Sequence, residues 1–433
     1  MNNKFVFIAI NVCISVVILT SVLVPIIGDS METETISANP DKLVISSYTA
    51  WTITSDGKLF GCGDNEYGQQ GVAPTIEGDE YDEYTVPIRT FTQRLTDQTV
   101  KDVACSSGTT WAVTTDGKLF GCGDNQYGQQ GDGTTTDVTT FTQRLTDQTV
   151  KDVVCSTCTT FAVTTDGKLF GCGNNTWGQT SDLEEEGMIT EFTQRLSDQT
   201  IKSVVCSNDT TWAVTTDGKL FGCGVDGGQG DDTGPVRTMT QRLSDQTIKS
   251  VACSRVTTWA VTTDGKLFGC GNNSYGQQGD GTTTDVTTFT QRLSDQTIKD
   301  VVCTTDNTWA LTTNGKMFGC GNNESGLQGD GTTDNVTTFT QRLTDQTVKV
   351  VACSDSMVMA LTTDGKLYGT GWIPWGDYED GVKSFTLNSD IAGGSSTVVK
   401  NSPINTLLET IPVMIIIAIV VMTIAVIVID RKG

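Results

Sequence analysis

The cysteines are the residues of this sequence with the most distinctive chemistry. Of 14 cysteines, 12 recur at two fixed positions of a repeated segment. The first position follows Val-Ala or Val-Val and holds Cys105, Cys155, Cys206, Cys253, Cys303 and Cys353. The second position lies between two glycines and holds Cys62, Cys122, Cys172, Cys223, Cys270 and Cys320. Thiols at such regular spacing form disulfides, bind a metal, or fill a core as small apolar side chains.

The ends of the repeat array suggest how these cysteines pair. The first repeat has Ile45 at the first position and the seventh has Thr370 at the second, so pairing within repeats would leave Cys62 and Cys353 without partners. Two strands separated by a third lie about 9–10 Å apart, whereas a disulfide needs Cα atoms within about 7 Å. The sequence therefore predicts six bridges between successive repeats: Cys62–Cys105, Cys122–Cys155, Cys172–Cys206, Cys223–Cys253, Cys270–Cys303 and Cys320–Cys353. Reduced thiols buried in the core are the alternative.

The sequence has few residues of the types that bind metal ions or catalyse reactions. The chain has no histidine, which removes the commonest general base and the commonest ligand of transition metals. Cys155-Ser-Thr-Cys158 has no second such element to complete a zinc site, and Cys158 is interpreted as a spare thiol. No nucleophile is accompanied by a base. We therefore expect no metal, no cofactor and no enzyme activity.

The cysteines belong to a repeat that sets the fold. DGKLFGCG begins at residue 56 and returns at 116, 166, 217 and 264, followed by NGKMFGCG at 314 and DGKLYGTG at 364. Seven copies near 50 residues apart indicate a repeat architecture. One unit shows four short strands, at 102–105, 109–115, 118–122 and 141–145, with an Asp-Gly hairpin between the second and third. The sequence predicts an all-β, seven-bladed β-propeller of four-stranded antiparallel blades over residues 43–388.

The unit resembles the regulator of chromosome condensation repeat. The resemblance lies in VAC, in the Ala-Val pair of TTWAVTTDGKLFGCG, and in the GNNSYGQQGDG loop. It implies a seven-bladed propeller, in agreement with the strand count. Three positions depart from the family: Ser106 replaces a glycine, Thr109 a histidine, and Cys122 a tryptophan. The founding member's nucleotide-exchange activity on a small nuclear GTPase is therefore not carried over, and an exchange factor remains the third hypothesis.

The connections on one face of the predicted propeller vary, whereas those on the other are nearly constant. In a four-stranded meander, the first–second and third–fourth connections emerge together, and these are the variable ones. Loops on a rigid scaffold commonly carry binding sites, and aromatic residues are enriched at interfaces. We therefore predict a ligand-binding face that includes Tyr81, Asp82, Tyr84, Glu184, Arg255, Trp372, Trp375 and Tyr378.

Both ends of the chain are strongly apolar. Residues 5–27 and 411–429 carry no charge and reach the length that spans a bilayer. Lys4, Arg431 and Lys432 place both tips in the cytoplasm under the positive-inside rule. The prediction is an N-terminal anchor (5–27), a linker (28–42), the propeller, a stalk (389–410) and a C-terminal transmembrane helix (411–429). The propeller would then lie on the extracytoplasmic side, unless the first segment is a cleaved signal peptide.

Three further patterns bear on the surface. Sequons occur at Asn174, Asn208, Asn272, Asn323 and Asn335, and we predict glycosylation there where the host permits it. The loops at 131–137 and 279–285 weakly resemble calcium loops, but ordinary turns are the favoured interpretation. An arginine recurs once per repeat, from Arg94 to Arg342, and we expect it to pair with the aspartate of the TDQT or SDQT segment.

The net charge of the chain limits which classes of molecule it can bind. Lysine and arginine number 28 against 51 aspartates and glutamates, a net charge of −23. Such acidity opposes nucleic-acid binding. The favoured function is a membrane-anchored propeller that binds a protein or a glycan through the variable face. The alternative is a purely structural component of a cell surface or virion envelope.

Overall fold

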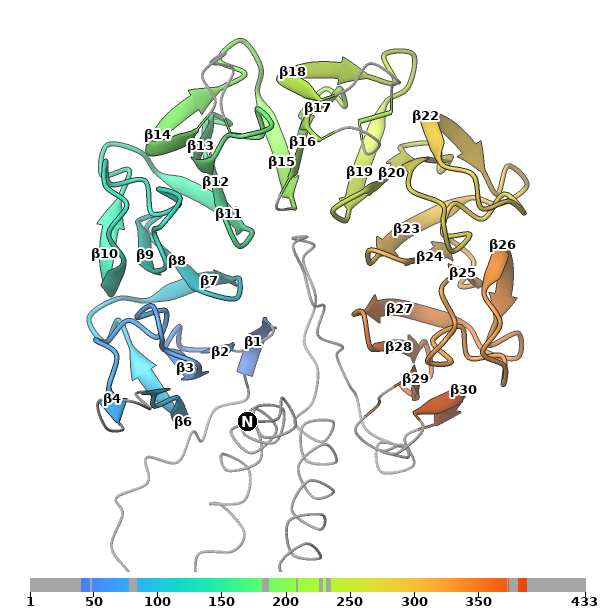
Figure 1. Cartoon of the computed structure of the whole chain (residues 1–433), viewed down its shortest axis with the longest axis horizontal. Helices are drawn as coiled ribbons and strands as arrows, with labels where there is room; N and C mark the ends of the chain where they lie inside the picture. The colour runs from blue at the N-terminus through green and yellow to red at the C-terminus, as the bar shows by residue number, and fades with distance from the viewer. Residues whose placement is uncertain are drawn as a thin grey trace, which may run out of the picture.

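Repeated blades form all of the structure that can be described. The computed structural model describes residues 40–46, 49–77, 84–180, 187–207, 209–225, 229–230, 235–371, 373 and 381–387. These residues form seven four-stranded antiparallel sheets and one two-stranded sheet, and they contain no helix. The seven sheets follow one another around a central axis (Figure 1). The prediction of repeated four-stranded blades is confirmed, and the sheets are named blades one to seven in chain order.

Each blade consists of four strands that are consecutive in the sequence apart from the small β4–β5 sheet. The innermost strands are β1 (Pro40–Ile45), β7 (Val100–Cys105), β11 (Val150–Cys155), β15 (Ile201–Cys206), β19 (Ile248–Cys253), β23 (Ile298–Cys303) and β27 (Val348–Cys353). The second strands are β2 (Thr49–Thr54), β8 (Thr109–Thr114), β12 (Thr159–Thr164), β16 (Thr210–Thr215), β20 (Thr257–Thr262), β24 (Asn307–Thr312) and β28 (Met357–Thr362).

The outer two strands complete each blade. The third strands are β3 (Leu59–Gly63), β9 (Leu119–Gly123), β13 (Leu169–Asn174), β17 (Leu220–Gly224), β21 (Leu267–Gly271), β25 (Met317–Gly321) and β29 (Leu367–Gly371). The outermost are β6 (Ile88–Arg94), β10 (Val138–Arg144), β14 (Met188–Arg195), β18 (Val236–Arg242), β22 (Val286–Arg292), β26 (Val336–Arg342) and β30 (Val382–Leu387). Blade one adds a small sheet of β4 (Ile76–Glu77) and β5 (Tyr84–Thr85) in its third–fourth loop.

The second strand is the buried centre of each blade. In β8 all six residues are buried, because threonine, tryptophan and valine side chains pack on both faces of the sheet. Trp111 lies across Gly121 of the neighbouring strand, where a Cβ atom would come within 2.4 Å of the indole ring. Glycine is therefore required at this position of LFGCG so that the large ring can pack against the backbone.

Aromatic contacts join successive blades. The Trp111 ring meets Phe192 of the next blade edge-to-face at 5.7 Å, and equivalent pairs occur at four other junctions. The indole nitrogen of Trp111 also donates a hydrogen bond to Thr160 Oγ1 of blade three, at 3.1 Å. The tryptophans are therefore packing residues between blades.

The hydrogen bonds between connections fix two opposite faces. Val150 N, at the start of a blade, donates to Gly117 O of the preceding Asp-Gly hairpin at 2.8 Å. On the other side, Asp124 N of a third–fourth loop donates to Gly108 O of the first–second turn, also at 2.8 Å. We name these the hairpin face and the loop face. The predicted division of the connections between two faces is confirmed.

The predicted disulfides are wrong in this structure, where the repeat cysteines are thiols. Cys122 lies in the third strand and its thiol donates to Gln69 O of the preceding blade at 3.5 Å, so it faces away from its expected partner, Cys155. Cys155 instead neighbours Cys105 and Cys206, which occupy the same position of the adjacent inner strands. A disulfide within a blade is excluded, because Thr110 lies between Cys105 and Cys122 in the sheet.

The terminal segments expected to cross a membrane, 5–27 and 411–429, lie outside the described residues, as does the predicted stalk 389–410. Of the predicted linker 28–42, residues 28–39 also lie outside them, and residues 40–42 belong to β1. Within the part that is described, no helix has the length and apolar character needed to cross a bilayer.

Candidate binding face

The hairpin face repeats the same chemistry in blade after blade. In blade two, Lys118 Nζ pairs with Asp116 at 2.7 Å, and the Thr114 hydroxyl donates to the same carboxylate. These hydrogen bonds, Lys118 first, hold the pKa of Asp116 at about 2. The same ion pair recurs in five other blades, and blade six has Asn314 instead of the aspartate. The polar side chains of these short turns pair within each turn, so the hairpin face presents nearly the same surface in every blade.

The loop face contains the predicted ligand residues that can be placed. Tyr84, in β5, is 57% exposed and donates to Glu77 at 3.2 Å. Arg255 lies in the first–second turn of blade five, where its Nε pairs with Asp209 of blade four at 3.0 Å. The two residues therefore belong to different blades and form no common site. Tyr81, Asp82, Glu184, Trp372, Trp375 and Tyr378 lie outside the described residues.

The predicted glycosylation sites differ in their access. The prediction is wrong for Asn323, because its side chain is fully buried and its amide donates to Asp330 and to Thr332. Asn335 is exposed, and its Oδ1 accepts from Asn323 N at 2.9 Å. Asn174 and Asn272 are half-buried, and Asn208 lies outside the described residues.

The recurrent arginine has a different partner from the one expected. Arg144 pairs with Asp132 of the 131–137 loop at 3.1 Å and donates from Nε to Gln130 O. The expected partner, Asp147 of TDQT, instead accepts from the Gln148 amide at the surface. Because Arg144 is in the outermost strand and its partners are in the third–fourth loop, these contacts connect the loop to that strand.

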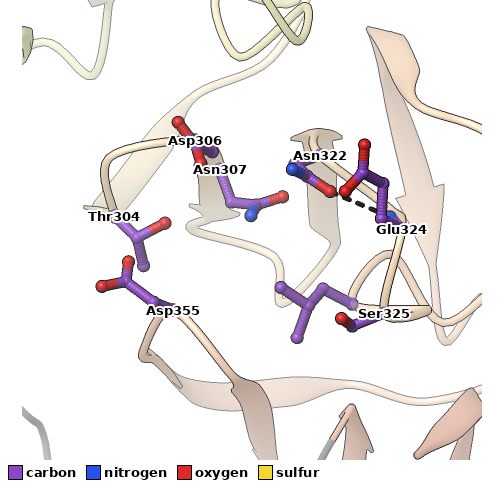
Figure 2. Close-up of a pocket in the computed structure, with 8 residues that line it drawn as sticks. Thr304, Asp306, Asn307, Asn322, Glu324, Ser325 and Asp355 are labelled. Atoms are coloured by element: carbon purple, nitrogen blue, oxygen red, sulfur yellow. Dashed lines mark hydrogen bonds between the residues drawn. The ribbon is translucent and has the colours of Figure 1, made fainter. Parts of the chain in front are cut away.

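A pocket of about 90 Å³ opens on the loop face between blades six and seven. It is lined by the first–second turn at 304–307, by the third–fourth loop at 322–327, and by Asp355 from the first–second turn of blade seven (Figure 2). Glu324 N donates to Asn322 Oδ1 at 2.8 Å and holds one wall of the pocket.

The pocket is acidic and incompletely satisfied. Asp306, Glu324 and Asp355 contribute carboxylates, and no lining residue is basic. Burial, followed by the charges of Asp355 and Glu324, raises the pKa of Asp306 above its ordinary value. The Thr304 hydroxyl is buried without a hydrogen-bond partner, and Figure 2 shows it directed into the pocket. Such a site favours a ligand that brings positive charge and hydrogen-bond donors.

These pocket residues were absent from the sequence-based prediction, which favoured long loops and aromatic side chains. A usable signal was nevertheless present in the repeat. Blade six carries Asn307, Ser325 and Leu327 where blades two, three and five carry threonine, an aromatic residue and glutamine.

Comparison with known proteins identifies the repeat. The family model described as "Regulator of chromosome condensation (RCC1) repeat" matches residues 56–113, and a second model of the same description matches residues 100–129, 150–179, 248–277 and 298–327. Each of the four shorter segments runs from the inner strand of a blade to its third–fourth loop, whereas the segment 56–113 runs from the hairpin of blade one to β8 of blade two. The chain therefore contains RCC1 repeats, in a divergent form. The resemblance proposed from the sequence is thereby confirmed.

Solved propellers share the fold of this RCC1-repeat protein at low identity. Human WBSCR16 matches with a TM-score of 0.58 and 19% identity, over 73% of this chain and 85% of that one. Prp20p from Saccharomyces cerevisiae, studied for binding to Gsp1p and histones, gives a TM-score of 0.55 and 14% identity, over 72% and 80%. Yeast RCC1 (Prp20) bound to Kap60 gives 0.54 and 15%, over 72% and 77%. At these identities the likeness shows the fold alone.

Proposed function

We propose that this RCC1-repeat protein is a membrane-anchored binding module that captures a protein partner through its loop face and catalyses no reaction. The observation that carries the proposal is the contrast between the two faces of one scaffold. The hairpin face repeats one ion-paired turn, whereas the loop face differs from blade to blade and contains an unsatisfied acidic pocket.

Protein binding agrees with the use of this fold by similar propellers. Prp20p has been studied for its binding to Gsp1p and histones, and yeast RCC1 has been crystallised bound to Kap60. A rigid ring of blades presents several loops at once, which limits the conformational cost of binding a large partner. The net charge of −23 favours a partner with a basic surface, because complementary charge accelerates encounter and selects the partner.

Anchoring at both ends would fix how the face is presented. The apolar segments 5–27 and 411–429, with basic residues at both tips, support a propeller on the extracytoplasmic side. Because innermost strands begin and outermost strands end on the hairpin face, that face would point towards the membrane and the loop face away from it. The reduced state of the repeat cysteines removes the disulfide argument for this location, so the proposal rests on the terminal segments.

A loop exchange tests the proposal. Replacing residues 72–87 and 372–381 with the regular 131–137 type of loop preserves the blades and removes the most irregular parts of the loop face. We expect loss of binding to cells or partner proteins that bind the native chain, with unchanged circular dichroism. Changing the Asp-Gly hairpins of the same blades serves as the control and should leave binding intact. Equal binding by all three proteins would favour a structural scaffold instead.

A further inference from the structure

The pocket between blades six and seven exists because blade six departs from its own repeat. The position before the loop glycine holds Tyr67, Tyr127, Trp177 and Tyr275 in blades one, two, three and five. Blade four has a shorter loop without an aromatic residue, and blade six has Ser325 at this position. The Tyr67 ring lies against the turn of blade two, so close that a Cβ atom at Gly108 would be 3.1 Å from it. Ser325 has no ring to cover the corresponding turn of blade seven, which leaves space beside Asp355.

A second departure removes a hydrogen bond between the blades. Gln129 and Gln277 each donate from Nε2 to a turn carbonyl of the following blade, at 3.2 and 3.3 Å respectively. The equivalent residue in blade six is Leu327, whose side chain is buried and cannot donate. The wall of the pocket is therefore apolar at this point, and it suits the methylene groups of a long side chain.

A third departure replaces the threonine of a hydroxyl pair in the first–second turn. In blade three Ser156 Oγ lies 2.7 Å from Thr159 Oγ1, and the same pair occurs in blades one, four and five. In blade two, by contrast, Ser106 Oγ and Thr109 Oγ1 are both buried without partners. Blade six has Asn307 in place of that threonine, and Asn307 Oδ1 accepts from Gln328 Nε2 at 2.8 Å. Thr304 is 8% exposed, and its Oγ1 finds no partner. A buried hydroxyl in this condition gains by accepting a hydrogen bond from a ligand.

We propose that this pocket binds the cationic end of one lysine or arginine side chain of the partner protein. The ammonium or guanidinium group would donate to Thr304 Oγ1 and lie among the carboxylates of Asp306 and Asp355. The inference rests on the proposed function, since it names the chemistry by which the loop face selects its partner. The pocket, of about 90 Å³, has room for a group of this size, and a cation with directed N–H donors satisfies both the charge and the hydroxyl.

Other ligands fit the pocket less well. An anion would add to the charge of three carboxylates. The missing aromatic residue removes the surface on which a sugar ring would stack. Among the described residues, no three carboxylates or thiols converge closely enough to hold a metal ion.

The test uses the purified full-length protein in detergent and four probes followed by saturation-transfer NMR. The probes are N-acetyl-arginine methylamide, N-acetyl-lysine methylamide, the neutral isostere N-acetyl-citrulline methylamide, and calcium chloride as a competitor. We expect the two cations to bind and citrulline to bind about tenfold more weakly or worse, because a charge-assisted hydrogen bond is lost. Calcium is expected to compete no better than an equal ionic strength of sodium chloride.

Variants connect binding to the pocket. Asp306→Asn and Asp355→Asn should each weaken the cationic probes, and Ser325→Tyr, which restores the aromatic residue of the repeat, should abolish binding. Asp345→Asn removes one exposed carboxylate from the hairpin face and is the matched control for net charge. Thr304→Val keeps the side-chain shape and removes the hydroxyl, so it tests the site even if Ser325→Tyr fails to fold.

Three results would overturn the inference: equal binding of citrulline, specific competition by calcium, or full binding by the Ser325→Tyr and Thr304→Val proteins. The broader function is tested separately by partner binding. If the loop exchange abolishes partner binding but the pocket variants do not, only the pocket inference fails. If cationic probes bind as expected but no partner depends on the loop face, the proposed function fails and the pocket remains.

Discussion

The tryptophans between blades offer a matched test of how this propeller holds together. Trp259 and Trp212 are both fully buried, and both meet a phenylalanine of the next blade edge-to-face, at 5.6 and 5.5 Å. They differ in one respect. The indole N–H of Trp259 donates to Thr308 Oγ1 of blade six at 3.0 Å, whereas that of Trp212 is buried without a partner. Substituting phenylalanine removes the same atoms at both positions.

The structure predicts that Trp259→Phe costs more stability than Trp212→Phe. Both variants lose packing in a site that collapses only partly. Trp259→Phe also breaks a hydrogen bond worth about 1 kcal/mol, whereas Trp212→Phe removes an unsatisfied donor that costs about 1–3 kcal/mol. The difference between the two free energies of unfolding should therefore be about 2 kcal/mol or more. Phe161 shows that the fold accepts phenylalanine at this position, with Thr211 of the next blade donating to Gln179 O instead.

Urea unfolding followed by far-ultraviolet circular dichroism measures the difference without relying on the substituted fluorophore. Thr308→Val supplies a double-mutant cycle with Trp259→Phe, and the coupling free energy should be close to the value of one buried hydrogen bond, about 1 kcal/mol. Equal destabilisation by the two phenylalanine variants would refute the reasoning. So would additive effects of Trp259→Phe and Thr308→Val, because the hydrogen bond would then contribute nothing measurable.

Three further predictions concern the loop face and the thiols. The pKa of Asp306 is raised in the folded protein, so its ionised carboxylate opposes folding. Asp306→Asn should therefore raise the urea midpoint at neutral pH, and this gain should disappear below the ordinary pKa of 3.8. An equal gain in urea midpoint at both pH values would contradict this. Burial first, then the charges of Asp124 and Asp209, raises the pKa of Cys158 to about 11. This half-buried thiol should nevertheless react with iodoacetamide before the ten repeat thiols that are buried, a set that excludes the half-buried Cys303 and Cys353, as peptide mass mapping can show. In a glycosylating host, Asn335 should carry a glycan and Asn323 should not; a glycopeptide at the buried site would refute the placement of that loop.

The blades could be predicted from sequence because local and global signals agree within the repeat. The segment 109–115 was expected as a strand and forms β8, Thr109–Thr114. Its β-branched residues and the following Asp-Gly turn specify both the strand and where it ends. The same pattern recurs in the second strand of the other blades, so an error in reading one repeat is corrected by its neighbours.

The contacts between blades could not be predicted in the same way. Sequence spacing gives the order of strands in a blade, but it does not say which neighbouring blade a side chain on the third strand faces. Cys122 faces the preceding blade, and the staggered disulfides failed for that reason. The turn after Arg144 was also not predicted: Leu145 adopts a φ of 47°, a left-handed conformation that leucine seldom takes and that begins the TDQT turn.

The candidate site shows how a propeller of near-identical units can acquire one distinct position. In blades three and five the junction with the next blade combines an aromatic ring, a glutamine and a hydroxyl pair on the loop face, so a ligand pocket requires that several of these be removed together. If only the ring were removed, the glutamine would still donate to the turn carbonyl of the next blade, and that carbonyl would need no ligand. If only the hydroxyl pair were lost, the unpaired hydroxyl would still be covered by the ring. Blade six carries all three changes, at Ser325, Leu327 and Asn307, and the adjoining turns supply Asp306 and Asp355. Blade four also lacks the aromatic residue and the first glutamine, but at blade six these changes lie beside Asp306 and Asp355, and that is the reason to look for the partner's basic side chain there.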